Sequence, residues 1–125
     1  AGDALGFLDP VFSSGVFLAL KSGTMLADEV DKALSAGPVN AQSFEQYGKR
    51  MQSSIETMRK IVYAFYDPQF SFGDLVKRGD HLRSSLTDCL IGNVDDQDFK
   101  ELFDSMSDLA HLPEPVEHGL AKASG

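Results

Sequence analysis

The chain has 125 residues, enough for one domain with a modest hydrophobic core. Its 19 acidic and 11 basic residues give a formal net charge of −8, which argues against nucleic acid or an anionic membrane as a partner. One cysteine, Cys89, excludes an internal disulfide and is compatible with a reducing, cytoplasmic setting. The longest apolar stretch, near Val16 to Leu20, is too short to cross a bilayer.

The first predicted helix runs from about Ser14 to Ser35. Its apolar residues recur at steps of three and four, which predicts one buried face: Val16, Ala19, Leu20, Gly23, Leu26, Ala27, Val30 and Leu34. Because glycine inside a helix costs about 1 kcal/mol relative to alanine, Gly23 indicates that another element packs closely against it. Gly37 and Pro38 end the helix.

The second predicted helix has the most regular pattern in the chain. Ser43-Phe44-Glu45-Gln46 matches a capping box, in which a serine and a polar side chain three residues later bond each other's backbone N–H groups. Helical spacing then predicts a buried face made of Phe44, Tyr47, Met51, Ile55, Met58, Val62 and Phe65. Asp67-Pro68 closes the element.

Weaker patterns follow Pro68. Phe70 and Phe72 are expected to anchor a connecting loop, and residues 72–77 to form a short helix capped by Ser71. A further helix is predicted from Gly79-Asp80 to about residue 90. No segment has the alternation of a strand. The sequence therefore predicts an all-α fold of about four to five helices.

The last predicted helix begins near Asp95 and Asp96, because carboxylates favour the positive end of the helix dipole. Its apolar face consists of Phe99, Leu102, Phe103, Met106 and Leu109. These elements define a helical domain over residues 14–112, followed by a flexible tail over residues 113–125.

No metal or serine-nucleophile site is predicted. The histidines, His81, His111 and His118, lack the spacing of a helical metal site. The acidic run from Asp95 to Asp98 lacks the glycine and the terminal glutamate of a calcium-binding loop. Ser13 and Ser14 have no paired base in the sequence around them.

The opening stretch carries the strongest chemical signal. It combines Gly2-Asp3-Ala4, Phe7-Leu8-Asp9-Pro10 and Phe12-Ser13-Ser14-Gly15-Val16, followed by a helix rich in small residues. Serine can cap a helix start, and glycine lets the backbone approach a bound group. The positive partial charge of a helix start attracts an anion or a polarised carbonyl. By themselves, these residues also fit a capped core helix.

This combination closely resembles the late flavin-binding motif of FAD-dependent oxidoreductases, specifically the flavin-dependent halogenases and their relatives in the p-hydroxybenzoate-hydroxylase-like superfamily. The resemblance is specific over residues 1–23 and looser up to Tyr66. It implies that Asp3 accepts hydrogen bonds from the ribityl chain of FAD, and that N–H groups at Gly15 and Val16 face the pyrimidine edge of the flavin. The implied cofactor-binding residues are Gly2, Asp3, Pro10, Ser13, Gly15 and Val16.

In halogenases the same helix start lines a halide site, which the resemblance places at Ser14 and Gly15. Tryptophan halogenases carry a glutamate two residues before that serine or threonine, where this chain has Phe12. The difference argues against that subtype. It favours relatives that act on phenolic or carrier-bound substrates, or FAD oxidoreductases that do not halogenate.

The chain lacks the GxGxxG motif that binds the ADP half of FAD. The resemblance therefore implies the C-terminal part of a larger α/β FAD-binding protein, whose remaining FAD-binding domain is the partner of this segment. The isolated chain is expected to lack activity, and its uncovered first helix to favour a homodimer. The alternative is a stand-alone acidic helical module that binds another protein.

Overall fold

A computed structural model describes residues 1, 6, 8, 10–12, 14–94 and 97–115. The described residues form no strand. They form five α-helices: α1 (Ser14–Ala36), α2 (Glu45–Tyr66), α3 (Phe72–Lys77), α4 (Asp80–Leu90) and α5 (Lys100–Ser107). Two 3-10 turns, η2 (Pro10–Phe12) and η3 (Ala41–Phe44), precede α1 and α2. The prediction of an all-α fold with four to five helices is confirmed.

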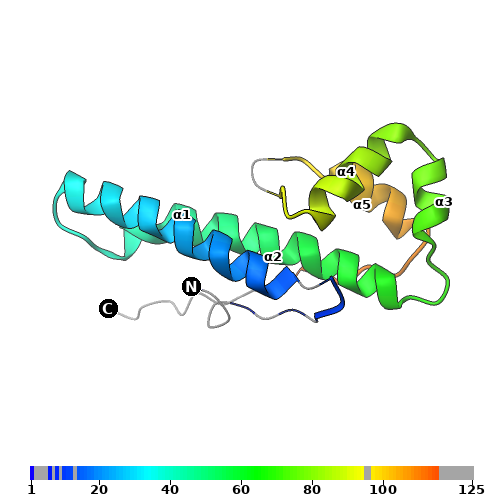
Figure 1. Ribbon diagram of the computed structural model, residues 1–125, viewed down its shortest axis with the longest axis horizontal. Helices are drawn as coiled ribbons and strands as arrows, with labels where there is room; N and C mark the ends of the chain where they lie inside the picture. Colours follow the sequence, from blue (N-terminus) through cyan, green and yellow to red (C-terminus); the bar gives the residue numbers. More distant parts are fainter. Residues whose placement is uncertain (2–5, 7, 9, 13, 95–96, 116–125) are drawn as a thin grey trace.

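The two long helices lie side by side along the length of the molecule, joined by η3 (Figure 1). The short helices α3, α4 and α5 gather against the half of α2 that contains its C-terminal end, away from η3 (Figure 1). The predicted tail, residues 113–125, lies outside the described residues from position 116 onwards.

Capping residues and glycines in the sequence predicted most helix ends correctly. The Ser71 hydroxyl accepts the Asp74 N–H at 3.3 Å, which is the predicted cap of α3. Helix α4 covers the predicted range and is followed by Gly92, whose φ of 77° lies in the left-handed region. Glycine reaches that region without steric cost, so it terminates the helix there.

The start of α2 differs from the prediction. Ser43 does not cap it; instead, Asn40 and Ser43 form a capping box around η3. The Asn40 side-chain oxygen accepts the N–H groups of Gln42 and Ser43, and the Ser43 hydroxyl accepts the Asn40 N–H. Since the asparagine occurs three residues before Ser43, it begins a tight turn first, and α2 starts only at Glu45.

The last helix also starts later than predicted, at Lys100. The Asp98 carboxylate accepts the Lys100 N–H at 2.8 Å, so it satisfies one of the N–H groups that a helix start leaves without an intrahelical partner. Asp95 and Asp96, where the prediction placed the start, lie outside the described residues.

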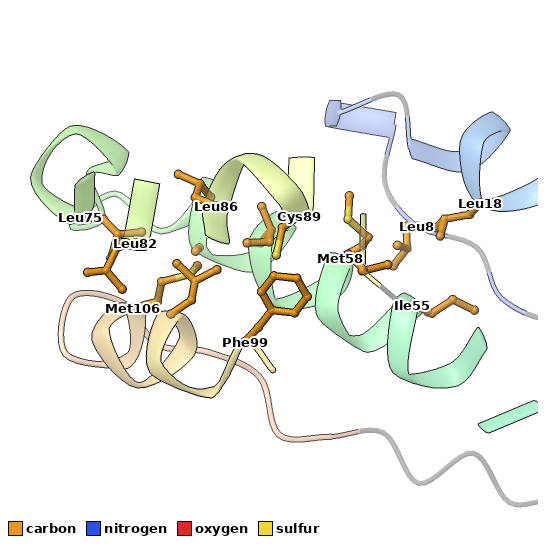
Figure 2. Close-up of a cluster of buried hydrophobic side chains, with 14 residues drawn as sticks. Leu8, Leu18, Ile55, Met58, Leu75, Leu82, Leu86, Cys89, Phe99 and Met106 are labelled. Atoms are coloured by element: carbon orange, nitrogen blue, oxygen red, sulfur yellow. The ribbon is translucent and has the colours of Figure 1, made fainter. Parts of the chain in front are cut away.

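The hydrophobic core lies where the short helices meet α2. Leu75 of α3, Cys89 of α4 and Met106 of α5 are fully buried, and Leu82, Leu86 and Phe99 lie between them (Figure 2). The core continues along α2 through Met58 and Ile55 to Leu8 and Leu18, which join it from the opening stretch and α1 (Figure 2). The predicted face of α2 is buried, except for Phe65, which is exposed, and Phe44, which is half-buried.

The predicted buried face of α1 is wrong. In the structure α1 buries Ser14, Leu18, Ser22 and Ala33, while an opposite line of residues is exposed. We call this exposed line the outward seam: Val16, Leu20, Gly23, Ala27, Val30 and Leu34. A Cβ built on Gly23 meets no atom within 4 Å, so nothing described packs against that glycine.

A buried hydrogen bond joins the polar side of α1 to α2. The Ser22 hydroxyl lies 2.6 Å from the Tyr47 hydroxyl, and both side chains are buried. Because each hydroxyl partners the other, serine can occupy the interface where the apolar pattern predicted only hydrophobic side chains.

We expect Tyr47→Phe to lower the free energy of unfolding by about 1 kcal/mol, because the buried hydrogen bond between the Ser22 and Tyr47 hydroxyls is lost. The double variant Ser22→Ala/Tyr47→Phe should cost less than the sum of the two single variants, since each single variant already removes the one hydrogen bond that the two hydroxyls share. Urea unfolding followed by circular dichroism measures all three. Additive costs would contradict the coupling.

Candidate functional site

The candidate site surrounds the start of α1. Pro10 lies in η2, and Ser14, Gly15 and Val16 form the first turn of α1. These four implied site residues therefore lie within one short turn-helix segment. The other three, Gly2, Asp3 and Ser13, lie outside the described residues.

Ser14 has a buried hydroxyl. The residue is 6% exposed, and its Oγ has no hydrogen-bond partner among the described residues. A buried hydroxyl without a partner costs about 1–3 kcal/mol, so such groups are rare in folded proteins. Its position in the first turn of a 23-residue helix adds the positive end of the dipole. Ser14 can therefore donate to an acceptor or an anion at this helix start.

The backbone beside Ser14 has open space around it. A Cβ built on Gly15 meets no atom within 4 Å, and Val16 is 74% exposed. The first N–H groups of a helix have no intrahelical acceptor. The first turn of α1 thus leaves room for a bound group on the side of Gly15 and Val16.

An aromatic cluster positions η2, and with it the start of α1. Phe12 packs edge to face on Phe65 of α2, with ring centroids 5.3 Å apart, and on Phe72 of α3 at 6.4 Å. Phe70 packs on Phe72 at 4.8 Å, so the predicted loop anchors are both in place. The role of Phe12 as an anchor is not predicted from the sequence, where this residue bears only on the substrate class. The sequence feature that could have indicated this anchoring role is an aromatic residue directly before Ser13 and Ser14 at the helix start.

No group of three or more metal-binding side chains gathers in the described part of the chain. In the same part, no helix combines the length and the apolar character needed to cross a membrane. Burial, and secondarily the charge of Asp88, raises the pKa of the Cys89 thiol to about 12. Because the thiolate is the nucleophile, Cys89 is a core residue without thiol reactivity near neutral pH.

Comparison with known proteins finds two relatives. The chain is 27% identical over 118 residues to the 1H-pyrrole-2-carbonyl-[peptidyl-carrier protein] chlorinase of Pseudomonas fluorescens, a match that covers 94% of this chain and 26% of that protein. The chain is distantly related to part of a halogenase. It spans about a quarter of the length of that relative.

The second relative is an uncharacterised protein, Mbar_A1602, of Methanosarcina barkeri. It is 30% identical over 74 residues, which cover 59% of this chain and 18% of that protein. No family model matches the chain, and no solved structure matches it either. Both relatives are therefore much longer than the segment they share with this chain.

Proposed function

We propose that the chain is the C-terminal part of an FAD-dependent oxidoreductase of the halogenase type, and that the start of α1 closes its flavin pocket. The observation that carries the proposal is the buried Ser14 hydroxyl without a described partner, next to the open space at Gly15. The distant chlorinase relative supports the same class of enzyme.

The residues at the start of α1 fit the polar edge of a flavin. The N–H groups at Gly15 and Val16 would donate to the pyrimidine edge, where the dipole of α1 stabilises negative charge. Asp3 would accept hydrogen bonds from the ribityl chain, with Gly2, Pro10 and Ser13 shaping the backbone around it. The cofactor, when bound in the longer protein, supplies the oxidation chemistry.

Ser14 is the residue we assign to a halide. Its hydroxyl would donate to the anion, and its burial would keep competing water away. Phe12 supports a substrate other than free tryptophan, because it stands where the tryptophan halogenases that the chain resembles carry a glutamate. We propose a small aromatic substrate held on a carrier, which is the kind of substrate named for the chlorinase relative.

The outward seam supports a larger partner for this segment. Val16, Leu20 and Leu34 are each at least 68% exposed on α1. Gly23 and Ala27 in the middle of the seam permit close approach of another backbone. We propose that the FAD-binding portion of the longer protein packs on this seam, and that the isolated chain holds no flavin because it lacks that portion.

The flavin proposal predicts a clear difference between two proteins. A longer chain that includes the preceding FAD-binding portion should purify with flavin absorbance, and the 125-residue chain should not. In the longer protein, Asp3→Ala should weaken FAD binding about tenfold or more, because a charge-assisted hydrogen bond is lost. Fluorescence titration of the apoprotein with FAD measures this loss.

Asp31→Ala is the matched control, since Asp31 is an exposed carboxylate on α1 more than four turns from its start. It should leave FAD binding unchanged. Ser14→Ala should raise the halide concentration needed for half-maximal turnover more than it changes FAD affinity. A colourless longer protein, or equal losses for Asp3→Ala and Asp31→Ala, would rule the proposal out.

The isolated chain is expected to self-associate through the outward seam. The seam is symmetric about the middle of α1, with large side chains at both ends and Gly23 and Ala27 in the centre, so an antiparallel second copy matches it. Sedimentation should show mass rising with concentration, and Leu20→Glu should abolish the rise without unfolding the chain. A monomer at every concentration would contradict this.

A further inference from the structure

A cleft of about 530 Å³ lies at the C-terminal end of α2, outside the candidate flavin site. Its lining is mostly apolar and comprises Val62, Tyr63, Tyr66, Asp67, Pro68 and His111. Val62 is buried, whereas Tyr63 and Tyr66 are 51% and 59% exposed. The segment after α5 returns across the end of α2 and brings His111 into the lining (Figure 1).

The Asp67 carboxylate is held in place by two backbone groups. One oxygen accepts the His111 N–H at 3.0 Å, and the other accepts the Gln69 N–H at 2.9 Å. The hydrogen bonds from His111 and then Gln69 lower the pKa of the Asp67 carboxyl, so it is ionised at neutral pH. The carboxylate also stands at the end of α2, where the helix dipole is negative. Both features favour a positively charged ligand.

The aromatic lining of the cleft also favours a positively charged ligand. A cation is attracted to the face of a tyrosine ring, and most strongly where water is partly excluded. The molecule already contains one such contact, because the Arg59 guanidinium lies 5.5 Å from the centre of the Tyr63 ring. That guanidinium is neutralised by Glu56, which it contacts through two nitrogens at 2.7 and 3.1 Å. Its charge therefore does not cancel that of Asp67.

We propose that this cleft binds a small organic cation, an ammonium group on a short apolar body. The ammonium would lie against Asp67 and the rings of Tyr63 and Tyr66, and the apolar body would cover Val62 and Pro68. The cleft is within the range of about 300–1,000 Å³ typical of sites for small molecules. This site is independent of the proposed flavin function.

Choline is the probe, and its neutral counterpart 3,3-dimethyl-1-butanol, which has carbon in place of nitrogen, is the matched control ligand. Choline should shift the Gln69 and His111 amide resonances of the 125-residue chain saturably, with a dissociation constant on the order of 1–10 mM. The neutral alcohol should bind about fivefold more weakly or not at all. Equal binding of the two ligands, or no saturable shift with choline, would overturn the proposal.

Two variants assign the binding to this cleft. Asp67→Asn should weaken choline binding about fivefold, and Tyr66→Leu, at a position that is 59% exposed, should reduce the preference for choline over the neutral alcohol, which Asp67 and Tyr63 still maintain in part. Asp74→Asn is the control, because it removes the charge of another exposed carboxylate, one that pairs with Lys77 in α3. Equal weakening by Asp67→Asn and Asp74→Asn would show a general charge effect and refute the site.

Discussion

Replacing Leu102 by alanine is expected to lower the free energy of unfolding by about 2–5 kcal/mol. Leu102 is 1% exposed on α5, in the core where α3, α4 and α5 meet α2. Alanine would remove buried apolar surface and leave a cavity that rigid helices fill only in part. Small domains are stable by only about 5–15 kcal/mol, so the variant loses much of its total stability. Urea unfolding monitored by circular dichroism measures the change.

Leu34→Ala is the matched control, because the substitution is the same and Leu34 is 68% exposed at the end of α1. It should change the unfolding free energy by no more than about 0.5 kcal/mol at a concentration where the chain is monomeric. The apolar pattern of α1 predicted that Leu34 is buried. Comparing Leu102→Ala with Leu34→Ala therefore also tests whether this face of α1 is exposed in the isolated chain. A loss at Leu34 as large as that at Leu102 would show that the outward seam is covered in the isolated chain.

Gly92→Ala is expected to destabilise the chain by about 2–4 kcal/mol, for two independent reasons. Gly92 has a φ of 77°, which costs an L-residue free energy. A Cβ built there would lie 2.0 Å from Cε1 of Phe17, so the ring must move away. That movement would disturb the contact between α1 and the end of α4, where Lys21 donates to the Gly92 carbonyl at 2.9 Å.

Gly23→Ala is the control for Gly92→Ala, because the same substitution is expected to have the opposite effect on stability. Gly23 lies inside α1 with nothing within 4 Å of a built Cβ, so alanine should stabilise the isolated chain by about 0.5–1 kcal/mol. In the longer protein, the same methyl group should hinder close packing on the outward seam. Thermal unfolding of the two variants side by side gives the comparison. Destabilisation by Gly23→Ala would mean that another part of the isolated chain covers this glycine.

At the candidate site, the sequence identifies residues but not their surroundings. Ser14, Gly15 and Val16 were identified from the composition of a helix start and from a resemblance carried by neighbouring residues. Neither signal shows whether a hydroxyl has a partner. That the buried Ser14 Oγ has no partner among the described residues is a property of the packed structure, because burial depends on residues that lie elsewhere in the sequence.

The cleft at the end of α2 could not be found in the sequence at all. In the sequence, Asp67 is interpreted only as part of a helix stop, and His111 only as a histidine without the spacing of a metal site. They are separated by 44 positions, and the chain joins them through a single hydrogen bond from the His111 N–H to Asp67. No periodicity or motif links two loop residues at that distance, so only the return of the chain after α5 reveals the site.

The sequence by itself determined the all-α fold and the extent of the long helices, because caps, glycines and helical periodicity act over a few residues. The tertiary structure decided which side of α1 is buried. Ser22 faces α2 because Tyr47 offers its hydroxyl a partner, and the apolar seam faces outward. Periodicity marks an apolar face, but only the neighbouring elements determine whether this chain or a partner covers it.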